Sequence, residues 1–227
     1  MTSWLFVVLW AVVTAFVAYV SYRTSRLLET WSPTSNILLG LPDNLLRLTL
    51  VFLCVALGYG LGPDVASLGW TAHQLGRSLA VGCIVGIILA LSLNATGVAA
   101  VRRWGADVYS DRILRYTLPI TRRQWPLVLL AMSISVLLEE LLFRSLPLGG
   151  LPALIPAEIL MWPLAVFFGL LHSPQGGWGV AGTTVAAIVL SLLFLATRSL
   201  WAPVAAHYVV NVYQLWRAWR VGLRFPA

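Results

Sequence analysis

The chain of 227 residues is poor in charge. It contains no lysine, so all fifteen basic residues are arginine, and there are only eight acidic residues. Hydrophobic residues make up 59% of the chain, and the mean hydropathy is +0.86. This composition lies outside the range of soluble globular domains and predicts a membrane protein. The net charge of +7 does not indicate a nucleic-acid partner, because the arginines flank apolar runs instead of forming one basic stripe.

Cysteine is equally scarce. Cys54 and Cys83 are the only two, and both lie within apolar segments without C-x-x-C spacing, which argues against a redox motif or a cysteine zinc site. The sequence also lacks G-x-S-x-G, H-E-x-x-H and a pair of aspartates within an apolar run. These absences argue against a serine-hydrolase elbow, a zincin-type metalloprotease and an intramembrane aspartic protease.

Long apolar runs divide the chain. The first, Trp4 to Val20, carries no charge, follows no basic segment and precedes no small-residue cleavage site, which predicts a retained transmembrane helix. Each run approaches the ~20 residues that cross ~30 Å of hydrocarbon. We therefore predict an all-α fold: one transmembrane domain over residues 1–227, with about seven helices bundled around an intramembrane polar site. The predicted spans are 4–20, 45–62, 78–101, 125–146, 153–172, 179–197 and 199–216.

The positions of the arginines predict an orientation. Most of them lie near the first loop, in the third loop or in the tail, which places the N-terminus outside and the C-terminus in the cytoplasm. We expect a multi-pass protein of a bacterial inner membrane. The third loop mixes arginine with aromatic and aliphatic residues, as amphipathic segments at a membrane surface do. The arginines concerned are Arg23, Arg26, Arg47, Arg102, Arg103, Arg112, Arg115, Arg122, Arg123, Arg217, Arg220 and Arg224.

Two apolar segments carry glycines four residues apart. They are "GYGLG" at 58–62 and "GCIVG" at 82–86. This spacing lets two helix backbones approach closely in a membrane, so we predict a close helix contact at each.

Ionisable side chains within spans are costly and therefore indicate function. Glu140 and Arg144 are four residues apart with the acid first, the favoured order for a helical ion pair. Glu139 lies about 100° further round the helix and has no basic residue three or four positions away. We therefore predict that the pair is structural and that Glu139 handles protons. Glu158 follows Pro156 and is predicted to mark a helix start.

Two histidines and an amide complete the candidate set. His172 ends the fifth span, with Phe168, a candidate substrate contact, one turn earlier on the same face; His207 and Asn211 also share a helix face. A carboxylate and an imidazole can deprotonate a water for attack on a carbonyl. An imidazole N–H and an amide can stabilise the resulting oxyanion. The same Glu139, His172 and His207 could instead hold zinc, with water as fourth ligand.

Counting residues along the predicted spans places the candidate side chains at different depths in the membrane. At ~1.5 Å per residue from the predicted span ends, Glu139 and His207 fall near mid-membrane, whereas His172 falls nearer the cytoplasmic face. A tilted helix, a bend at Pro163 in the fifth span, or span ends other than those predicted would bring them together.

The order E-E-x-x-x-R, F-x-x-x-H and H-x-x-x-N resembles the CPBP family, the CAAX-protease and bacteriocin-processing (Abi) intramembrane proteases. The resemblance implies that Glu139 and His172 activate the attacking water and that His207 and Asn211 line the oxyanion site. It also implies glutamate-type chemistry, so we expect no cofactor, with zinc as the alternative. The family usually has glycine where this chain has Ser145, and we expect altered helix packing there. The motifs, within a predicted catalytic core at 124–217, read Glu139-Glu140-Leu-Leu-Phe-Arg144, Phe168-Gly-Leu-Leu-His172 and His207-Tyr-Val-Val-Asn211.

The leading interpretation is an intramembrane endopeptidase that cuts a membrane-tethered protein or peptide at a C-terminal tail, a leader or a sorting anchor. The alternative is a membrane scaffold or bacteriocin-immunity protein that binds a partner without cutting it. A proton-coupled transporter using Glu139 and His207 is a third interpretation, but the sequence lacks the internal repeats typical of transporters. The sequence selects neither a substrate nor an oligomeric state.

Overall fold

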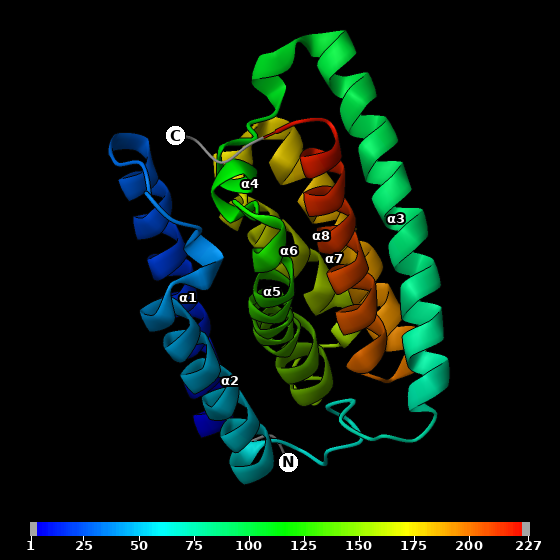
Figure 1. Ribbon diagram of the computed structural model, residues 1–227. Helices are drawn as coiled ribbons and strands as arrows, with labels where there is room; N and C mark the ends of the chain where they lie inside the picture. Colours follow the sequence, from blue (N-terminus) through cyan, green and yellow to red (C-terminus); the bar gives the residue numbers. More distant parts are fainter. Residues whose placement is uncertain (1–3, 224–227) are drawn as a thin grey trace.

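The computed structural model describes residues 4–223, and each regular element in that range is helical (Figure 1). The all-α prediction is confirmed. The elements are α1 (Trp4–Thr30), η1 (Ile37–Leu39), α2 (Leu41–Leu61), α3 (Leu75–Trp104), η2 (Ala106–Val108), α4 (Arg112–Thr117), η3 (Arg122–Gln124), α5 (Trp125–Glu140), η4 (Leu141–Gly149), α6 (Ala157–Leu171), η5 (Ser173–Gln175), α7 (Gly176–Thr197) and α8 (Trp201–Arg220).

Five helical stretches are long and apolar enough to cross a membrane, so the protein is multi-pass. The predicted count of seven is not confirmed. Helix α6 has only 15 residues, and α8, with 20, is less apolar because it carries polar side chains such as His207 and Asn211. Helix α1 begins and α8 ends at opposite ends of the bundle (Figure 1). The orientation stays a prediction, and Arg224 lies outside the described residues.

The helices form a bundle with α1 and α2 on one side, α3 on the other and α5 to α8 between them (Figure 1). Helix α3 packs along α8, α6 along α7, and α2 against α5. Large apolar side chains such as Phe52, Ile88 and Leu130 remain exposed on outer faces. An extensive apolar surface of this kind suits contact with lipid instead of water.

Glycines set the closest helix approach in the bundle. A Cβ at Gly82 or Gly86 of α3 would collide with the backbone of α8 at Ala202 or Ala206, so the close contact predicted from "GCIVG" is confirmed. The other glycine pair differs, because the space beside Gly58 is filled by an aromatic ring of the following loop and not by a helix.

The helix that carries the first motif changes its winding there. The sequence predicted one helix over 125–146, but α5 ends at Glu140 and continues as the π-helix η4. A π-helix pairs each carbonyl with the N–H five residues later, and Pro147 has no N–H for the carbonyl of Leu142. The indole Nε1 of Trp10 on α1 donates to that carbonyl instead, at 2.9 Å. The contact anchors α1 beside the motif.

Ser145 joins η4 to the loop between α2 and α3. Its hydroxyl accepts a hydrogen bond from Trp70 Nε1 at 2.7 Å and donates one to the Leu68 carbonyl at 2.8 Å. Ser145 and Leu68 are fully buried. A glycine at this position, as the resembled family usually has, could make neither bond. The difference therefore adds a polar link between the loop and η4.

Ser145→Ala is expected to lower the free energy of unfolding by about 1–3 kcal/mol, because it leaves the Leu68 carbonyl and the Trp70 N–H without their partner. Thermal unfolding in detergent measures the effect. The matched control is Ser133→Ala on α5, whose hydroxyl bonds only to Leu130 of its own helix, and little change is expected for it. Equal shifts in the two variants would contradict the role of the link.

Candidate active site

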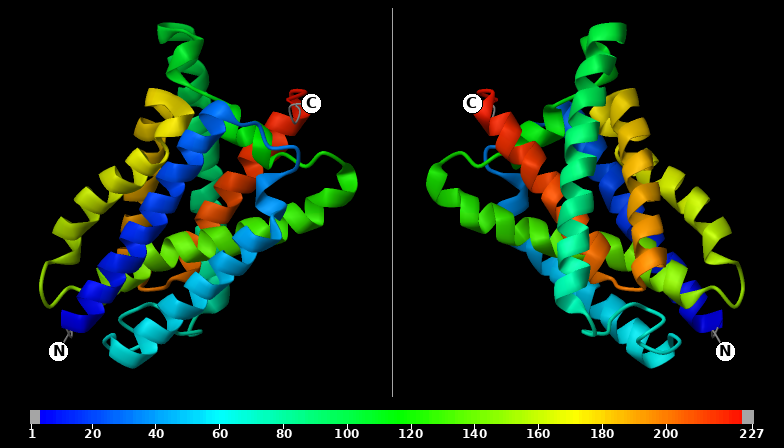
Figure 2. Two further views of the ribbon diagram at one scale, coloured as in Figure 1. Left: turned by 90° about the vertical axis from the view of Figure 1, so that its left-hand side faces the viewer. Right: turned by 90° about the vertical axis from the view of Figure 1, so that its right-hand side faces the viewer.

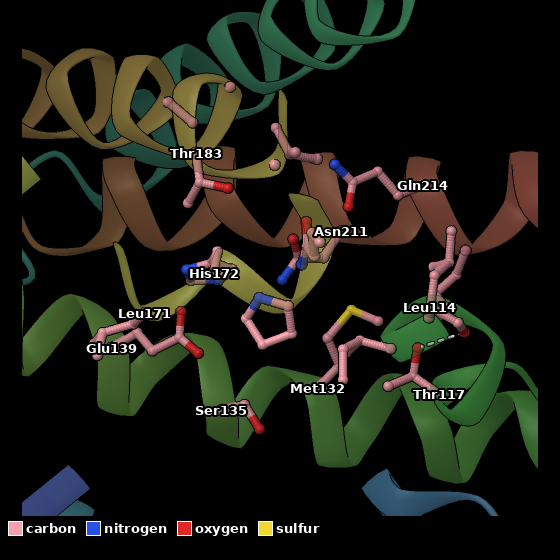
Figure 3. Close-up of a pocket in the computed structure, with 18 of the residues that line it drawn as sticks. Leu114, Thr117, Met132, Ser135, Glu139, Leu171, His172, Thr183, Asn211 and Gln214 are labelled. Carbon is pink, nitrogen blue, oxygen red and sulfur yellow. Dashed lines mark hydrogen bonds between the residues drawn. The ribbon is translucent and has the colours of Figure 1, made fainter. Parts of the chain in front are cut away.

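A cavity of about 920 Å³ opens inside the bundle, and every α-helix contributes to its lining. In Figure 3, Glu139 of α5, His172 at the end of α6 and Asn211 of α8 face a common space. The structure thus brings together side chains from three separate motifs. The cavity lining includes all four predicted catalytic residues, Glu139, His172, His207 and Asn211.

Glu139 and His172 line one cavity in the structure, whereas their depths in a membrane stay a prediction. Helix α5 crosses the bundle obliquely (Figure 2), so a count of residues along it overestimates its rise along the bundle. His172 follows the last residue of α6, and both side chains line the same cavity.

Glu140 and Arg144 form a buried ion pair. Arg144 Nη1 donates to Glu140 Oε1 at 2.9 Å, and their side chains are 1% and 0% exposed. Arg144 Nη2 also donates to the Ala187 carbonyl of α7 at 3.3 Å, and its guanidinium carbon lies 4.8 Å from the centre of the Phe168 ring of α6. The pair therefore connects α5 and η4 with α6 and α7.

Glu140 also holds His207, a contact that the sequence did not reveal. His207 Nδ1 lies 2.7 Å from Glu140 Oε1, the same oxygen that accepts from Arg144. Because Oε1 is the acceptor in the ion pair with Arg144, we assign Nδ1 of His207 as the donor that carries the hydrogen. The ring is thereby oriented with Nε2 toward Glu139, whose Oε2 is 3.7 Å away.

His172 is oriented by a different acceptor. Its Nδ1 lies 2.8 Å from the carbonyl of Phe168, one turn earlier. Because a carbonyl can only accept, Nδ1 is the protonated nitrogen of the neutral ring and Nε2 keeps its lone pair. His172 is therefore arranged to accept a proton at Nε2.

Glu139 differs from its neighbour in burial and in partners. Its side chain is 32% exposed, against 0% for Glu140. Within residues 4–223 no hydrogen bond engages the Glu139 carboxylate, and its separation from His207 is longer than a hydrogen bond. The carboxylate is therefore available to a water or a substrate group in the cavity.

Phe168 lies at the centre of the site. Its ring centre is 4.9 Å from that of Phe143, 4.8 Å from that of His172 and 6.1 Å from that of His207. Only 3% of the residue is exposed. It lines the cavity, but its packing supports the ion pair and both histidines more than it offers surface to a ligand. Contact with substrate stays a prediction.

Whether the site holds zinc stays a prediction. Among the described residues, no three His, Cys, Asp or Glu side chains are grouped to hold a metal ion. Of the suggested ligands, His207 approaches Glu139 through Nε2, and no hydrogen bond or ion pair joins Glu139 to His172 in the described part of the chain. No step below is derived through a metal. Glu158 is exposed in the first turn of α6, as predicted, and does not line the cavity.

Comparison with known proteins gives one finding. Residues 121–213 match the family model described as type II CAAX prenyl endopeptidase Rce1-like. The matched segment contains all three motifs and runs from η3 into α8, whereas α1, α2 and α3 lie outside it. Comparison with curated proteins and with solved structures gives no significant match.

Proposed function

We propose that this chain, whose residues 121–213 match the type II CAAX prenyl endopeptidase Rce1-like model, is a CAAX-type intramembrane protease of the CPBP family and hydrolyses a peptide bond of a membrane-tethered substrate inside its cavity. The observation that carries the proposal is the convergence of two proton-accepting groups and two hydrogen-bonding groups on one cavity within an apolar bundle. These residues are Glu139, His172, His207 and Asn211.

The first step is activation of water. The Glu139 carboxylate and the free Nε2 of His172 both face the cavity, where a water held between them can attack the substrate carbonyl (Figure 3). Glu139 takes the proton of that water and later delivers it to the leaving amine. General acid–base assistance of this kind contributes about 10²–10⁴ in rate.

The second element is stabilisation of the oxyanion. Asn211 can donate from its amide, and His207 can donate from Nε2. Because Nδ1 of His207 already carries the hydrogen donated to Glu140, a donor at Nε2 requires the doubly protonated ring. The carboxylates of Glu140 and Glu139 lie 2.7 and 3.7 Å from its Nδ1 and Nε2, an arrangement that suits a donor at each nitrogen. Glu140 is thus a positioning residue in addition to half of an ion pair.

A comparison of membrane proteomes tests the proposal and identifies the substrate. Cells with the chain should contain membrane-anchored peptides that have lost a terminus, and cells carrying Glu139→Gln should accumulate the uncut forms at the level of cells without the chain. If the chain is instead a scaffold or immunity protein, Glu139→Gln should leave its phenotype unchanged. That result would favour binding without cleavage.

Metal removal is expected to leave activity intact. The purified protein should hold less than one tightly bound zinc per chain, and cleavage should survive a chelator, because Glu139 and His172 can activate water without a metal. Metal analysis and a cleavage assay before and after chelation measure this. Stoichiometric zinc, with activity lost to chelator and restored by added metal, would reverse the choice of mechanism.

A further inference from the structure

A basic side chain outside the three motifs reaches the same cavity. Arg47 lies on α2, is half-buried, and lines the cavity together with Leu46 and Leu50. Helix α2 packs against α5, and the Glu139 carboxylate is within electrostatic reach of the Arg47 guanidinium. Arg47 therefore places a positive charge beside the proposed site of hydrolysis.

The Arg47 guanidinium is held in place but not neutralised by contact. Asn44 donates from Nδ2 to the carbonyls of Leu38 and Gly40, at 2.7 and 2.9 Å, which turns its Oδ1 toward Arg47 Nη1 at 3.4 Å. Among residues 4–223, no carboxylate forms an ion pair with Arg47. Asp43, one turn earlier, also lines the cavity and is a stronger electrostatic partner of Arg47 than Glu139 is, but its carboxylate folds back over Gly40 at the helix start and forms no ion pair with the guanidinium.

The surroundings make this cation a binding group. A guanidinium in a largely apolar cavity is costly unless an anion approaches it. Its planar fork matches a carboxylate, which it can bind through two parallel hydrogen bonds. Arg144 differs from Arg47, because the charge of Arg144 is paired with the carboxylate of Glu140. Arg47 is left for a ligand that enters the cavity.

We propose that Arg47 binds the free C-terminal carboxylate of the substrate and so selects peptides cut close to their C-terminus; this inference rests on the proposed function. A C-a-a-X tail ends three residues after its cysteine. Three extended residues span about 10 Å, and Arg47 and Glu139 line the same cavity of about 920 Å³. Leaders and internal sorting anchors present no carboxylate so near the cut bond, so the site favours C-terminal tails among the substrate classes considered.

A matched pair of peptides tests the role of Arg47. The probes are one prenylated C-a-a-X peptide with a free C-terminal acid and the same peptide as its C-terminal amide, with the protein in nanodiscs of neutral lipid. We expect the wild type to prefer the acid by about tenfold or more in kcat/KM, as loss of one charged hydrogen bond implies. Arg47→Gln should abolish the preference by slowing only the acid, and Arg47→Lys should restore part of it.

Controls separate this role from general effects of charge. Arg103→Gln removes an equal charge from an exposed position on α3 that does not line the cavity, and its acid preference should equal that of wild type. Equal losses on acid and amide in Arg47→Gln would overturn the inference, because Arg47 would then act on Glu139 or on folding. A defect that appears only in nanodiscs with anionic lipid would overturn it in favour of a lipid headgroup as the anion.

A binding experiment separates this inference from the proposed function. In Glu139→Gln, which is expected not to cleave, the acid peptide should bind about tenfold tighter than the amide, and adding Arg47→Gln should remove the difference. If the wild type bound the acid peptide with this preference but cleaved neither peptide, the proposed protease activity would be refuted and the carboxylate-binding role of Arg47 would stand. If the wild type cleaved the acid and the amide peptide at equal rates, the carboxylate-binding role of Arg47 would be refuted and the proposed protease activity would stand.

Discussion

Glu139→Gln and His172→Ala are each expected to lower kcat for peptide cleavage by about 10²–10⁴, the usual contribution of a general acid–base group. Both side chains face the cavity, and neither takes part in the buried ion pair. Folding should therefore be nearly unaffected. Because Glu139 has no hydrogen bond to a described residue and is 32% exposed, its replacement by glutamine removes chemistry without removing a structural contact.

The measurements are cleavage of an identified substrate and thermal unfolding of the same detergent preparations. Glu158→Gln is the matched control, since it makes the same chemical change at an exposed position on α6 outside the cavity. It should cleave at the normal rate. Normal cleavage by either Glu139→Gln or His172→Ala would remove that residue from the mechanism.

Glu140→Gln and Arg144→Ala are expected to destabilise the fold by about 3–5 kcal/mol, because each leaves an uncompensated charge in a buried site. The loss should be seen as a lower unfolding temperature and less folded protein in the membrane. Both side chains are fully buried, and Glu140 Oε1 accepts hydrogen bonds from Arg144 and from His207. Glu140→Gln should also reduce the activity of whatever protein folds, since a neutral amide oxygen holds His207 more weakly than the carboxylate does.

A double variant distinguishes the destabilisation caused by an unpaired charge from that caused by lost packing. Glu140→Gln combined with Arg144→Met leaves no isolated charge, so its cost should be less than the sum of the two single changes. If Glu139→Gln proved to be the destabilised variant, and Glu140→Gln stable but inactive, the assignment of roles to the two carboxylates would be reversed.

The sequence pattern predicted those structural features that depend on residues close together in the chain. Apolar runs predicted helices at nearly all of the observed positions, because a helix satisfies its own backbone in lipid. The spacing of Glu140 and Arg144 predicted an ion pair, and that pair is present at 2.9 Å. The change to a π-helix was not predicted. One of its carbonyls accepts a hydrogen bond from Trp10, 132 residues earlier in the chain, and no local pattern carries that information.

The sequence by itself determined the membrane class, the helical fold and the identity of the candidate catalytic side chains, because composition and i, i+4 spacing act within one helix. Only the tertiary structure decided how those side chains work together. Helix α5 brought Glu139 to the cavity that His172 also lines, Glu140 became the acceptor that orients His207, and α2 placed Arg47 at the same cavity. Each of these depends on contacts between helices far apart in the chain, whose distances and angles are fixed by packing and not by spacing along the sequence.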